Sequence, residues 1–237
     1  MVATVCPTSF RGPPIVRALL LAAGRGERMR PLTDDCPKPL LTVGKETLIE
    51  RHLRKLNEAG VRDVVINVHY RADLIQEVLG NGERYGLNIS YSLEQVLLET
   101  GGGARQALTF LGDAPFIIVS SDILVDYDYR RLMEPGLLKN HVVLVRNPAH
   151  HSRGDFRLTA DGLARLGNEA TFAGIGVISP SLVRRCSKAS YPLREVLFPA
   201  ANEGALTGEM HLGYWSDIGT PQRLSDARAD YESGLCR

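Results

Sequence analysis

The sequence predicts an α/β protein in which a largely parallel sheet is covered by helices on both faces. Two observations predict this class. Short apolar runs, such as residues 18–23 and 64–68, are typical of strands buried on both faces, and they alternate along the chain with segments of helical periodicity. The chain has 237 residues, of which 44 % are hydrophobic and 23 % charged, and this suffices to bury the core that such a fold needs.

The first half of the chain shows clear boundaries for its predicted elements. The strand over residues 18–23 ends at Gly24. Thr47 and Glu50 have the spacing of a capping box, and they precede a helix that Gly60 closes. A strand at 64–68, a helix through Leu74, Ile75 and Val78, and an alternating strand at 89–93 follow.

The second half continues the alternation. We expect a helix from about Gly102 to Leu111, and strands at residues 116–119, 142–145 and 175–178. Thr220 and Pro221 have the N-cap and first-turn pattern of a last helix. Ligands of parallel sheets bind at the carboxyl ends of strands, so the loops after Ala23, Val119 and Tyr214 are the candidate functional loops.

Composition and charge argue against nucleic acid and membranes as partners of this protein. With 28 basic and 27 acidic residues, the net charge of +1 provides no broad basic field for nucleic acid or an anionic membrane. No apolar run approaches the roughly 18 residues that a membrane span requires. The four cysteines lie far apart without a CxxC pair, which favours a reducing, cytoplasmic location over a disulfide framework or a zinc site.

The chain shows no internal repeat and no linker that would divide it. We therefore expect a single domain over residues 16–237. Residues 1–15 hold three prolines and a glycine but no continuous apolar stretch, so we expect a flexible extension there and no secretory signal.

A glycine-rich turn follows the first strand. Its small residues allow close approach of backbone N–H groups to phosphate oxygens: Ala22, Ala23, Gly24 and Gly26. Arg28 adds a planar cation that suits phosphate. A Walker loop is absent, and the dinucleotide fingerprint breaks at Met29. The glycines alone leave a phosphate-binding loop and an ordinary tight turn equally open.

Three charged residues are further candidates. Pro37 and Pro39 restrict the backbone around Lys38, which is either a phosphate ligand or a surface lysine. Asp122 follows the strand at 116–119, and Asp217 follows Tyr214-Trp215-Ser216. Acids at strand ends either converge on Mg²⁺ or cap turns.

These segments together resemble the sugar-phosphate nucleotidyltransferase family: Ala22-Ala23-Gly24-x-Gly26-x-Arg28, Pro31-Leu32-Thr33 and Pro37-Lys38-Pro39. Members join a nucleoside triphosphate to a sugar 1-phosphate and release pyrophosphate. The resemblance runs from Arg17 to about Tyr231 and implies a Rossmann-like, mixed and mostly parallel sheet and dependence on Mg²⁺. It implies catalytic phosphate contacts for Arg28 and Lys38, nucleotide contacts for the glycine-rich turn, and metal ligation by Asp122 and Asp217.

The resemblance also extends to a base-binding segment. Glu94 and the run Leu98-Glu99-Thr100-Gly101-Gly102-Gly103 lie between a strand and a helix. The resemblance implies nucleotide contacts for Glu94, Thr100 and Gly101, whereas the residues alone also allow an ordinary helix entry. Most relatives carry a Gly-Thr-Ala-Gly or Gly-Leu-Ala segment here, so this departure leaves the identity of the base open.

The sugar side departs from the common Glu-Lys-Pro pattern. The segment Asn147-Pro148-Ala149-His150-His151-Ser152-Arg153-Gly154-Asp155-Phe156, with the preceding LETGGG run, resembles the N-acetylmuramic acid α-1-phosphate uridylyltransferases of bacterial cell-wall recycling. It implies sugar contacts for Gly154, Asp155 and Gly174. Adjacent side chains on an extended strand point to opposite faces, so we expect a structural or substrate-contact role for His150 and His151 rather than a metal site.

The resemblance therefore implies transfer of UMP from UTP to N-acetylmuramic acid α-1-phosphate. Two alternatives remain: a nucleotidyltransferase for another sugar 1-phosphate, such as a mannose 1-phosphate guanylyltransferase, and a non-catalytic nucleotide-sensing subunit. A non-catalytic subunit should have lost phosphate or metal residues, whereas all four are present: Arg28, Lys38, Asp122 and Asp217. The oligomeric state stays open.

Overall fold

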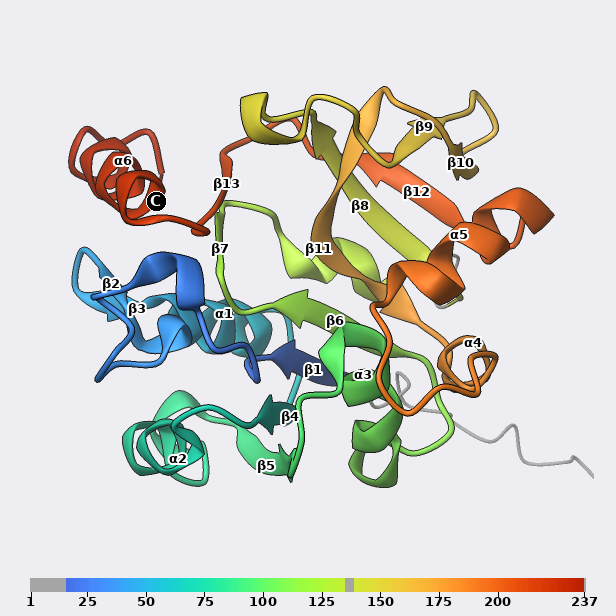
Figure 1. Cartoon of the computed structure of the whole chain (residues 1–237). Coiled ribbons are helices and arrows are strands. Elements are labelled where there is room, and N and C mark those ends of the chain that lie inside the picture. Colours follow the sequence, from blue (N-terminus) through green and yellow to red (C-terminus); the bar gives the residue numbers. More distant parts are fainter. Residues whose placement is uncertain (1–15, 135–138, 237) are drawn as a thin grey trace, which may run out of the picture.

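The described residues form a central sheet of nine strands (Figure 1). The computed structural model describes residues 16–134 and 139–236, so the extension expected over residues 1–15 lies outside the described residues. The strand order is β10-β9-β11-β6-β1-β4-β5, with β8 also beside β11 and β12 beside β8. The strands are β1 (Arg17–Leu21), β4 (Asp63–Val68), β5 (Asn88–Leu93), β6 (Phe116–Ser120), β8 (His141–Arg146), β9 (Phe156–Leu158), β10 (Ala164–Leu166), β11 (Ala170–Ile178) and β12 (Thr207–Met210).

The sheet is mixed, as the family resemblance implies. Strands β5, β4, β1 and β6 are all parallel, with Leu20 opposite Ile66 on one side and Val119 on the other. Strand β11 runs antiparallel to both β6 and β8, and β12 is parallel to β8. The parallel half confirms the apolar runs as buried strands. The antiparallel β11 makes the second half of the sheet different from a purely parallel fold.

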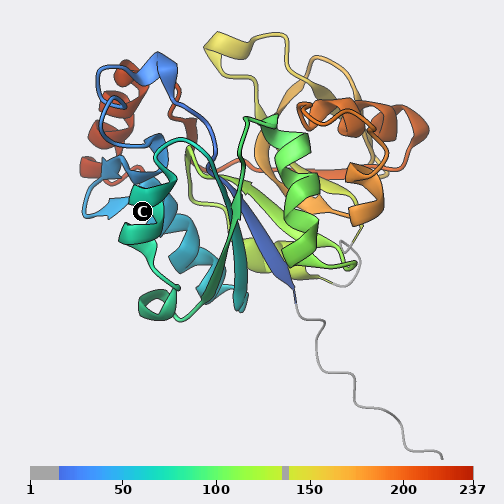
Figure 2. The same ribbon diagram turned by 60° about the horizontal axis from the view of Figure 1, so that its bottom comes forward.

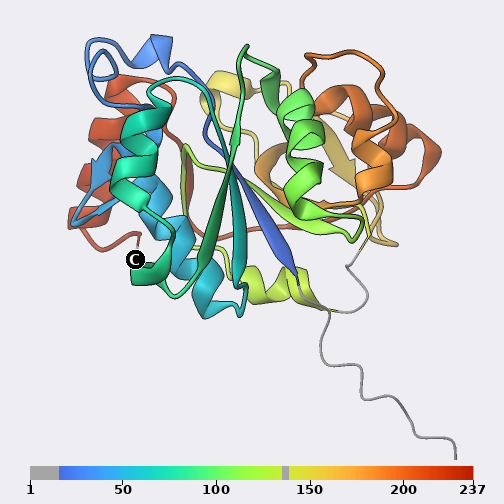
Figure 3. The ribbon, with the colours of Figure 1, turned by 90° about the horizontal axis from the view of Figure 1, so that it is seen from below.

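Helices cover both faces of the sheet (Figure 3). Helices α1 (Leu48–Glu58) and α2 (Ala72–Leu79) pack on one face, where Leu20 belongs to their core cluster. Helices α3 (Glu99–Leu111), α4 (Pro180–Val183) and α5 (Arg194–Glu203) pack on the other face with Leu19. Neighbouring residues of β1 thus face opposite cores, and this explains why the strand is apolar throughout.

A third cluster lies beside the segment that follows β1. Helix α6 (Pro221–Glu232) packs there through Leu224 and Ala227 against Met29 and Leu48 (Figure 2). Two small antiparallel sheets lie nearby, formed by β2 (Thr42–Val43) with β3 (Glu46–Thr47) and by β7 (Ile123–Val125) with β13 (Trp215–Asp217). Short 3-10 turns are η1 (Glu27–Met29), η2 (Lys38–Leu40), η3 (Glu83–Tyr85), η4 (Tyr129–Met133) and η6 (Ala149–His151).

Local signals mark two helix starts correctly and one incorrectly. Thr47 and Glu50 form the predicted reciprocal capping box at α1, and the Thr220 hydroxyl accepts from the backbone N–H of Arg223 at α6. Helix α3 begins at Glu99, one turn before the predicted start near Gly102. In the described part of the chain, no helix is both long and apolar enough to cross a membrane.

Candidate active site

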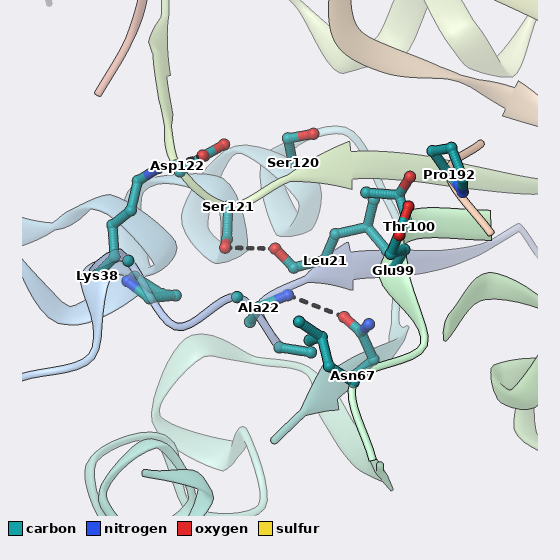
Figure 4. Close-up of a pocket in the computed structure, with 15 residues that line it drawn as sticks. Leu21, Ala22, Lys38, Asn67, Glu99, Thr100, Ser120, Ser121, Asp122 and Pro192 are labelled. Carbon is teal, nitrogen blue, oxygen red and sulfur yellow. Dashed lines mark hydrogen bonds and ion pairs between the residues drawn. The ribbon is translucent and has the colours of Figure 1, made fainter. Parts of the chain in front are cut away.

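The main pocket opens at the carboxyl ends of β1 and β6 (Figure 4). Its volume of about 370 Å³ falls in the range of small-molecule sites. It is lined by Leu21, Ala22, Ala23, Gly24, Gly26, Lys38, Pro39, Asn67, Leu97, Glu99, Thr100, Ser120, Ser121, Asp122 and Pro192. Lys38 and Asp122 lie at one end, while Glu99, Thr100 and Pro192 lie at the other. Four predicted nucleotide contacts in the turn, together with Lys38, Thr100 and Asp122, therefore surround one space.

The glycine-rich turn has room for a ligand. Gly24 is exposed, and a Cβ built on it would meet no atom within 4 Å. Gly26 has a φ of 66°, the left-handed region that favours glycine, and its carbonyl accepts from the Thr33 hydroxyl at 2.8 Å. The hydrogen bond from Thr33 thus fixes the turn, and both glycines line the main pocket.

A buried chain of hydrogen bonds supports this turn. The backbone N–H of Ala22 donates to Oδ1 of Asn67 at 2.8 Å, and Nδ2 of Asn67 donates to Oε1 of Glu94 at 2.7 Å. The other oxygen of Glu94 accepts from the backbone N–H of Leu98. Glu94 is only 2 % exposed and does not line the main pocket. The structure therefore places this predicted nucleotide contact behind the pocket wall, where it orients Asn67.

Lys38 and Asp122 form an ion pair inside the main pocket. Nζ of Lys38 lies 2.5 Å from Oδ2 of Asp122, and the two side chains are 12 % and 38 % exposed. Pro37, with φ −63° and ψ 140°, leads into the turn η2, which begins at Lys38. The prolines that flank Lys38 restrict the backbone from which its side chain reaches the main pocket.

Asp217 reaches the same region from the other end of the chain. In the β7–β13 pair Asp217 lies opposite Ile123, and the backbone N–H of Ile218 donates to the carbonyl of Asp122 at 2.8 Å. Asp122, which directly precedes β7, and Asp217, the last residue of β13, are therefore close neighbours. Pairing of two three-residue strands, almost a hundred residues apart in sequence, brings the two predicted metal ligands together.

The carboxylate of Asp217 lies between Arg223 and His150. Nη1 of Arg223 donates to Oδ2 of Asp217 and also lies 2.7 Å from Nε2 of His150. Nε2 of His150 is 2.9 Å from Oδ1 of Asp217, and the role of this nitrogen depends on the histidine tautomer. In the tautomer that accepts from Arg223, Nε2 carries no proton, and Oδ1 of Asp217 is buried with no hydrogen-bond donor in the described residues.

Arg28 lies in an adjoining outer pocket. That pocket is lined by Arg25, Gly26, Glu27, Arg28, Met29, Lys38, Leu97 and Gly219, and it shares Gly26, Lys38 and Leu97 with the main pocket. The Arg28 side chain is exposed, and within residues 16–134 and 139–236 it has no carboxylate within 4 Å. Among the described residues, the Arg28 guanidinium is therefore an exposed cation of the outer pocket that no carboxylate neutralises.

The glycine run at the start of α3 packs against its neighbours, whereas Gly101 was predicted to contact the nucleotide. Gly101 lies inside the helix, where an added Cβ would come within 2.2 Å of the Tyr191 ring, and its N–H donates to the Tyr191 carbonyl. An added Cβ at Gly103 would come within 2.4 Å of Glu94. The run is required for close packing, and Gly101 does not line the main pocket. Burial raises the pKa of Tyr191 to about 12, which keeps its phenol neutral.

Glu99 and Thr100 are the residues of this run that reach the main pocket. Glu99 has a φ of 59°, a strained conformation for a side chain with a Cβ and one that is common at functional sites. Thr100 Oγ1 accepts from the backbone N–H of Leu193 at 2.8 Å. The helix start is thereby tied to the loop before α5.

A side pocket of about 230 Å³ continues from the main pocket. The two share Leu21, Thr100, Ser120 and Pro192. The side pocket is further lined by Asp155, Phe156, Phe172, Leu193, Arg194, Leu197 and Phe198. Oδ2 of Asp155 accepts from the backbone N–H of Phe172 at 3.0 Å, and Oδ1 lies 3.1 Å from Nε2 of His151. The predicted sugar contact Asp155 is therefore in the pocket wall.

The two predicted sugar-binding glycines lie at the edge of this region. Gly174 has a φ of 80°, and its added Cβ would come within 2.8 Å of the Ser120 hydroxyl, in the part of β11 where the register with β8 shifts. Gly154 has a φ of 57° and packs on Asn147. Neither glycine lines the side pocket itself. Gly174 lets β11 approach the shared wall at Ser120.

His150 and His151 point to different acids. His150 contacts Asp217, whereas His151 contacts Asp155. Among the described residues, no group of three or more His, Cys, Asp or Glu side chains is arranged to hold a metal ion. The pair therefore connects the Asp217 region to the side pocket. Sequence reasoning missed this arrangement, along with Asn67, Ser120, Glu99 and Arg223, because hydrophobic periodicity does not show which polar side chains the folded backbone brings together. His151 meets Asp155 only four residues away, through the η6 turn, and Arg223 meets Asp217 six residues away at the start of α6.

By its fold and the position of its pocket, the protein falls in the Rossmann-like α/β class, in which ligands bind at the carboxyl ends of strands. A family model described as Nucleotidyl transferase matches residues 17–151, more than half of the chain. The chain belongs to this nucleotidyl transferase family.

Individual relatives match over most of this chain. A Neisseria meningitidis serogroup B protein named N-acetylmuramate alpha-1-phosphate uridylyltransferase is 42 % identical over 225 residues, 90 % of this chain and 97 % of that protein. A mannose-1-phosphate guanyltransferase from Aspergillus fumigatus is 32 % identical over 240 residues, 93 % of this chain and 64 % of that protein. A solved UDP-glucose pyrophosphorylase with bound UDP-glucose shares the fold, with a TM-score of 0.75 at 15 % identity, covering 93 % of this chain and 99 % of that chain.

Proposed function

We propose that the protein transfers UMP from UTP to N-acetylmuramic acid α-1-phosphate, giving UDP-N-acetylmuramic acid and pyrophosphate. The observation that carries this proposal is the convergence of the Gly24 turn, Lys38, Asp122 and Asp217 at one edge of the sheet. The choice of sugar and base follows the 42 % identical relative, which matches along nearly its whole length. We place the reaction in the cytoplasm and in peptidoglycan recycling, carried out by one domain over residues 16–237.

The proposed reaction depends on cationic side chains placed beside the phosphates and needs no proton transfer. A phosphate oxygen of the sugar phosphate attacks the α-phosphorus of UTP in line, the bond to the bridging oxygen breaks, and pyrophosphate leaves. The nucleophile is already anionic, so no general base is needed. Catalysis then consists of orientation and charge neutralisation. Lys38 neutralises charge at the reacting phosphates, and Arg28, exposed in the outer pocket, stabilises the pyrophosphate.

The residues present fit a divalent cation. Magnesium binds through one or two carboxylates together with phosphate oxygens and water. Asp122 faces the main pocket, and Oδ1 of Asp217 is buried without a hydrogen-bond donor in the described part of the chain. These two carboxylates would hold Mg²⁺, which when bound would supply further positive charge to the phosphates.

Similarity to a mannose-1-phosphate guanyltransferase supports a second candidate function, transfer of GMP to mannose 1-phosphate. The mannose-1-phosphate guanyltransferase matches 93 % of this chain, although the chain spans only 64 % of that protein. Transfer of GMP to mannose 1-phosphate would use the same phosphate residues with a different base and sugar. The two candidates therefore differ only in what the far end of the main pocket and the side pocket accept.

A substrate panel separates the candidates. The purified protein is incubated with Mg²⁺, each of the four nucleoside triphosphates and several sugar 1-phosphates, and pyrophosphate release is measured. The proposal predicts the highest kcat/KM for UTP with N-acetylmuramic acid α-1-phosphate. Preference for GTP with mannose 1-phosphate would establish the second candidate, and no release with any pair would indicate a non-catalytic nucleotide-sensing subunit.

A further inference from the structure

The two charged side chains of the side pocket differ in whether the protein already satisfies them. Both oxygens of Asp155 have partners, the backbone N–H of Phe172 and the ring of His151. The Arg194 guanidinium is exposed and, within the described residues, has neither a carboxylate within 4 Å nor a side-chain hydrogen bond. The adjacent Glu195 is engaged by Lys188, at 2.8 and 3.0 Å. Arg194 is therefore available to a ligand in the side pocket.

The rest of the side pocket wall is mostly apolar. The rings of Phe156, Phe172 and Phe198 and the side chain of Leu197 form it, and Phe156 contacts Phe198 edge to face. An apolar wall restricts water around a neighbouring ion pair, so a charge-assisted hydrogen bond there is stronger than one in open solvent. Arg194 is also the first residue of α5, and the partial positive charge of that helix end favours an anion further.

Two guanidiniums that have no carboxylate partner in the described part of the chain thus lie at opposite ends of one pocket system. Arg28 is in the outer pocket, and Arg194 is in the side pocket. The main pocket connects them, through Gly26 and Lys38 on one side and through Thr100 and Ser120 on the other. A triphosphate accounts for the positive charge at the first end. The positive charge at the second end calls for an anionic group on the other substrate.

We propose that the side pocket contains a carboxylate subsite, in which Arg194 binds an acidic substituent of the sugar phosphate. This inference rests on the proposed function, because N-acetylmuramic acid differs from N-acetylglucosamine by a lactyl ether that ends in a carboxylate. Arg194 then determines specificity. Its guanidinium pairs with the lactyl carboxylate of the muramic sugar, and it makes no such contact with N-acetylglucosamine, which lacks that group.

The test compares two sugar phosphates that differ in this one group. Calorimetry measures the Kd of N-acetylmuramic acid α-1-phosphate and of N-acetylglucosamine α-1-phosphate for the wild type, Arg194→Gln and Arg194→Lys. A charged hydrogen bond at a partly open site corresponds to about a tenfold change in Kd. Arg194→Gln should weaken binding of the muramic compound about tenfold and leave the glucosamine compound unchanged within twofold, and Arg194→Lys should recover part of the loss.

A matched control removes an arginine elsewhere. Arg185 pairs with Glu203 on the surface and does not line any of the three pockets, so Arg185→Gln should leave both Kd values unchanged. Equal weakening of both sugar phosphates by Arg194→Gln, or no weakening of either, would overturn the carboxylate subsite.

A transfer assay on the same proteins keeps the two proposals apart. Selective binding of the muramic compound through Arg194 without pyrophosphate release would support the subsite and refute the proposed reaction. Transfer to N-acetylmuramic acid α-1-phosphate with a kcat/KM that Arg194→Gln does not change would support the reaction and refute the subsite.

Discussion

Replacement of Lys38 by methionine should abolish most turnover while leaving the fold intact. Methionine keeps the apolar stem and removes the ammonium group that lies 2.5 Å from Asp122. A preorganised charge at a reacting centre contributes on the order of 10²–10³ in kcat, and Lys38 lines both the main and the outer pocket. Because Asp122 is 38 % exposed, loss of the pair should lower the free energy of unfolding by about 1 kcal/mol or less.

Steady-state pyrophosphate release and thermal unfolding followed by circular dichroism measure these two effects. Lys188→Met is the matched control, since Lys188 also pairs with a carboxylate, Glu195 at 2.8 Å, but lies on the surface outside the pockets. The control should keep wild-type kcat. A Lys38→Met enzyme that folds and retains kcat within about threefold of wild type would refute the charge-neutralisation role, because the expected factor is on the order of 10²–10³.

Four further predictions concern the pocket, the core and the metal ligands. Gly24→Ala should keep the wild-type Tm and raise KM for the nucleotide, because the added methyl group enters open space beside the main pocket. Gly101→Ala should lower the free energy of unfolding in urea by about 1–3 kcal/mol, because the added Cβ would lie 2.2 Å from the Tyr191 ring. Burial, with Lys55 nearby, lowers the pKa of His52 from 6.5 to about 4. The unfolded chain therefore binds a proton that the folded chain does not, and the free energy of unfolding should fall by about 2 kcal/mol from pH 7 to pH 5, a dependence that His52→Gln removes. Asp217→Asn should weaken Mn²⁺ binding to the nucleotide complex at least about tenfold by electron paramagnetic resonance, whereas Asp126→Asn, at an exposed carboxylate outside the main pocket, should not.

Features determined by neighbouring residues could be predicted from the sequence. The apolar runs over β1, β4 and β6 reflect burial on both faces, which acts on every residue of a strand. The capping box at Thr47 and the N-cap at Thr220 depend on residues three positions away. The glycine-rich turn, Lys38 and Asp122 were identifiable for a related reason, because each stands next to a predicted strand end or a proline pair.

Features that depend on distant pairing could not be derived from pattern. Strands β7 and β13 have three residues each and are stabilised by each other, so neither has a period that a sequence reveals. The position of Glu94 behind the wall depends on Asn67, and the need for Gly101 depends on the Tyr191 ring. The contacts of His150 with Asp217 and of His151 with Asp155 require the η6 turn, which replaces the extended strand that the sequence suggested.

The most direct measurement is a crystal structure of the protein with Mn²⁺ and a non-hydrolysable UTP analogue, with the ion located by its anomalous scattering. We expect the triphosphate against the Gly24–Arg28 turn with an oxygen within hydrogen-bond distance of Lys38, and the ion coordinated by both Asp122 and Asp217. A nucleotide bound elsewhere on the sheet, or an ion that neither aspartate coordinates, would contradict the assignment of this pocket.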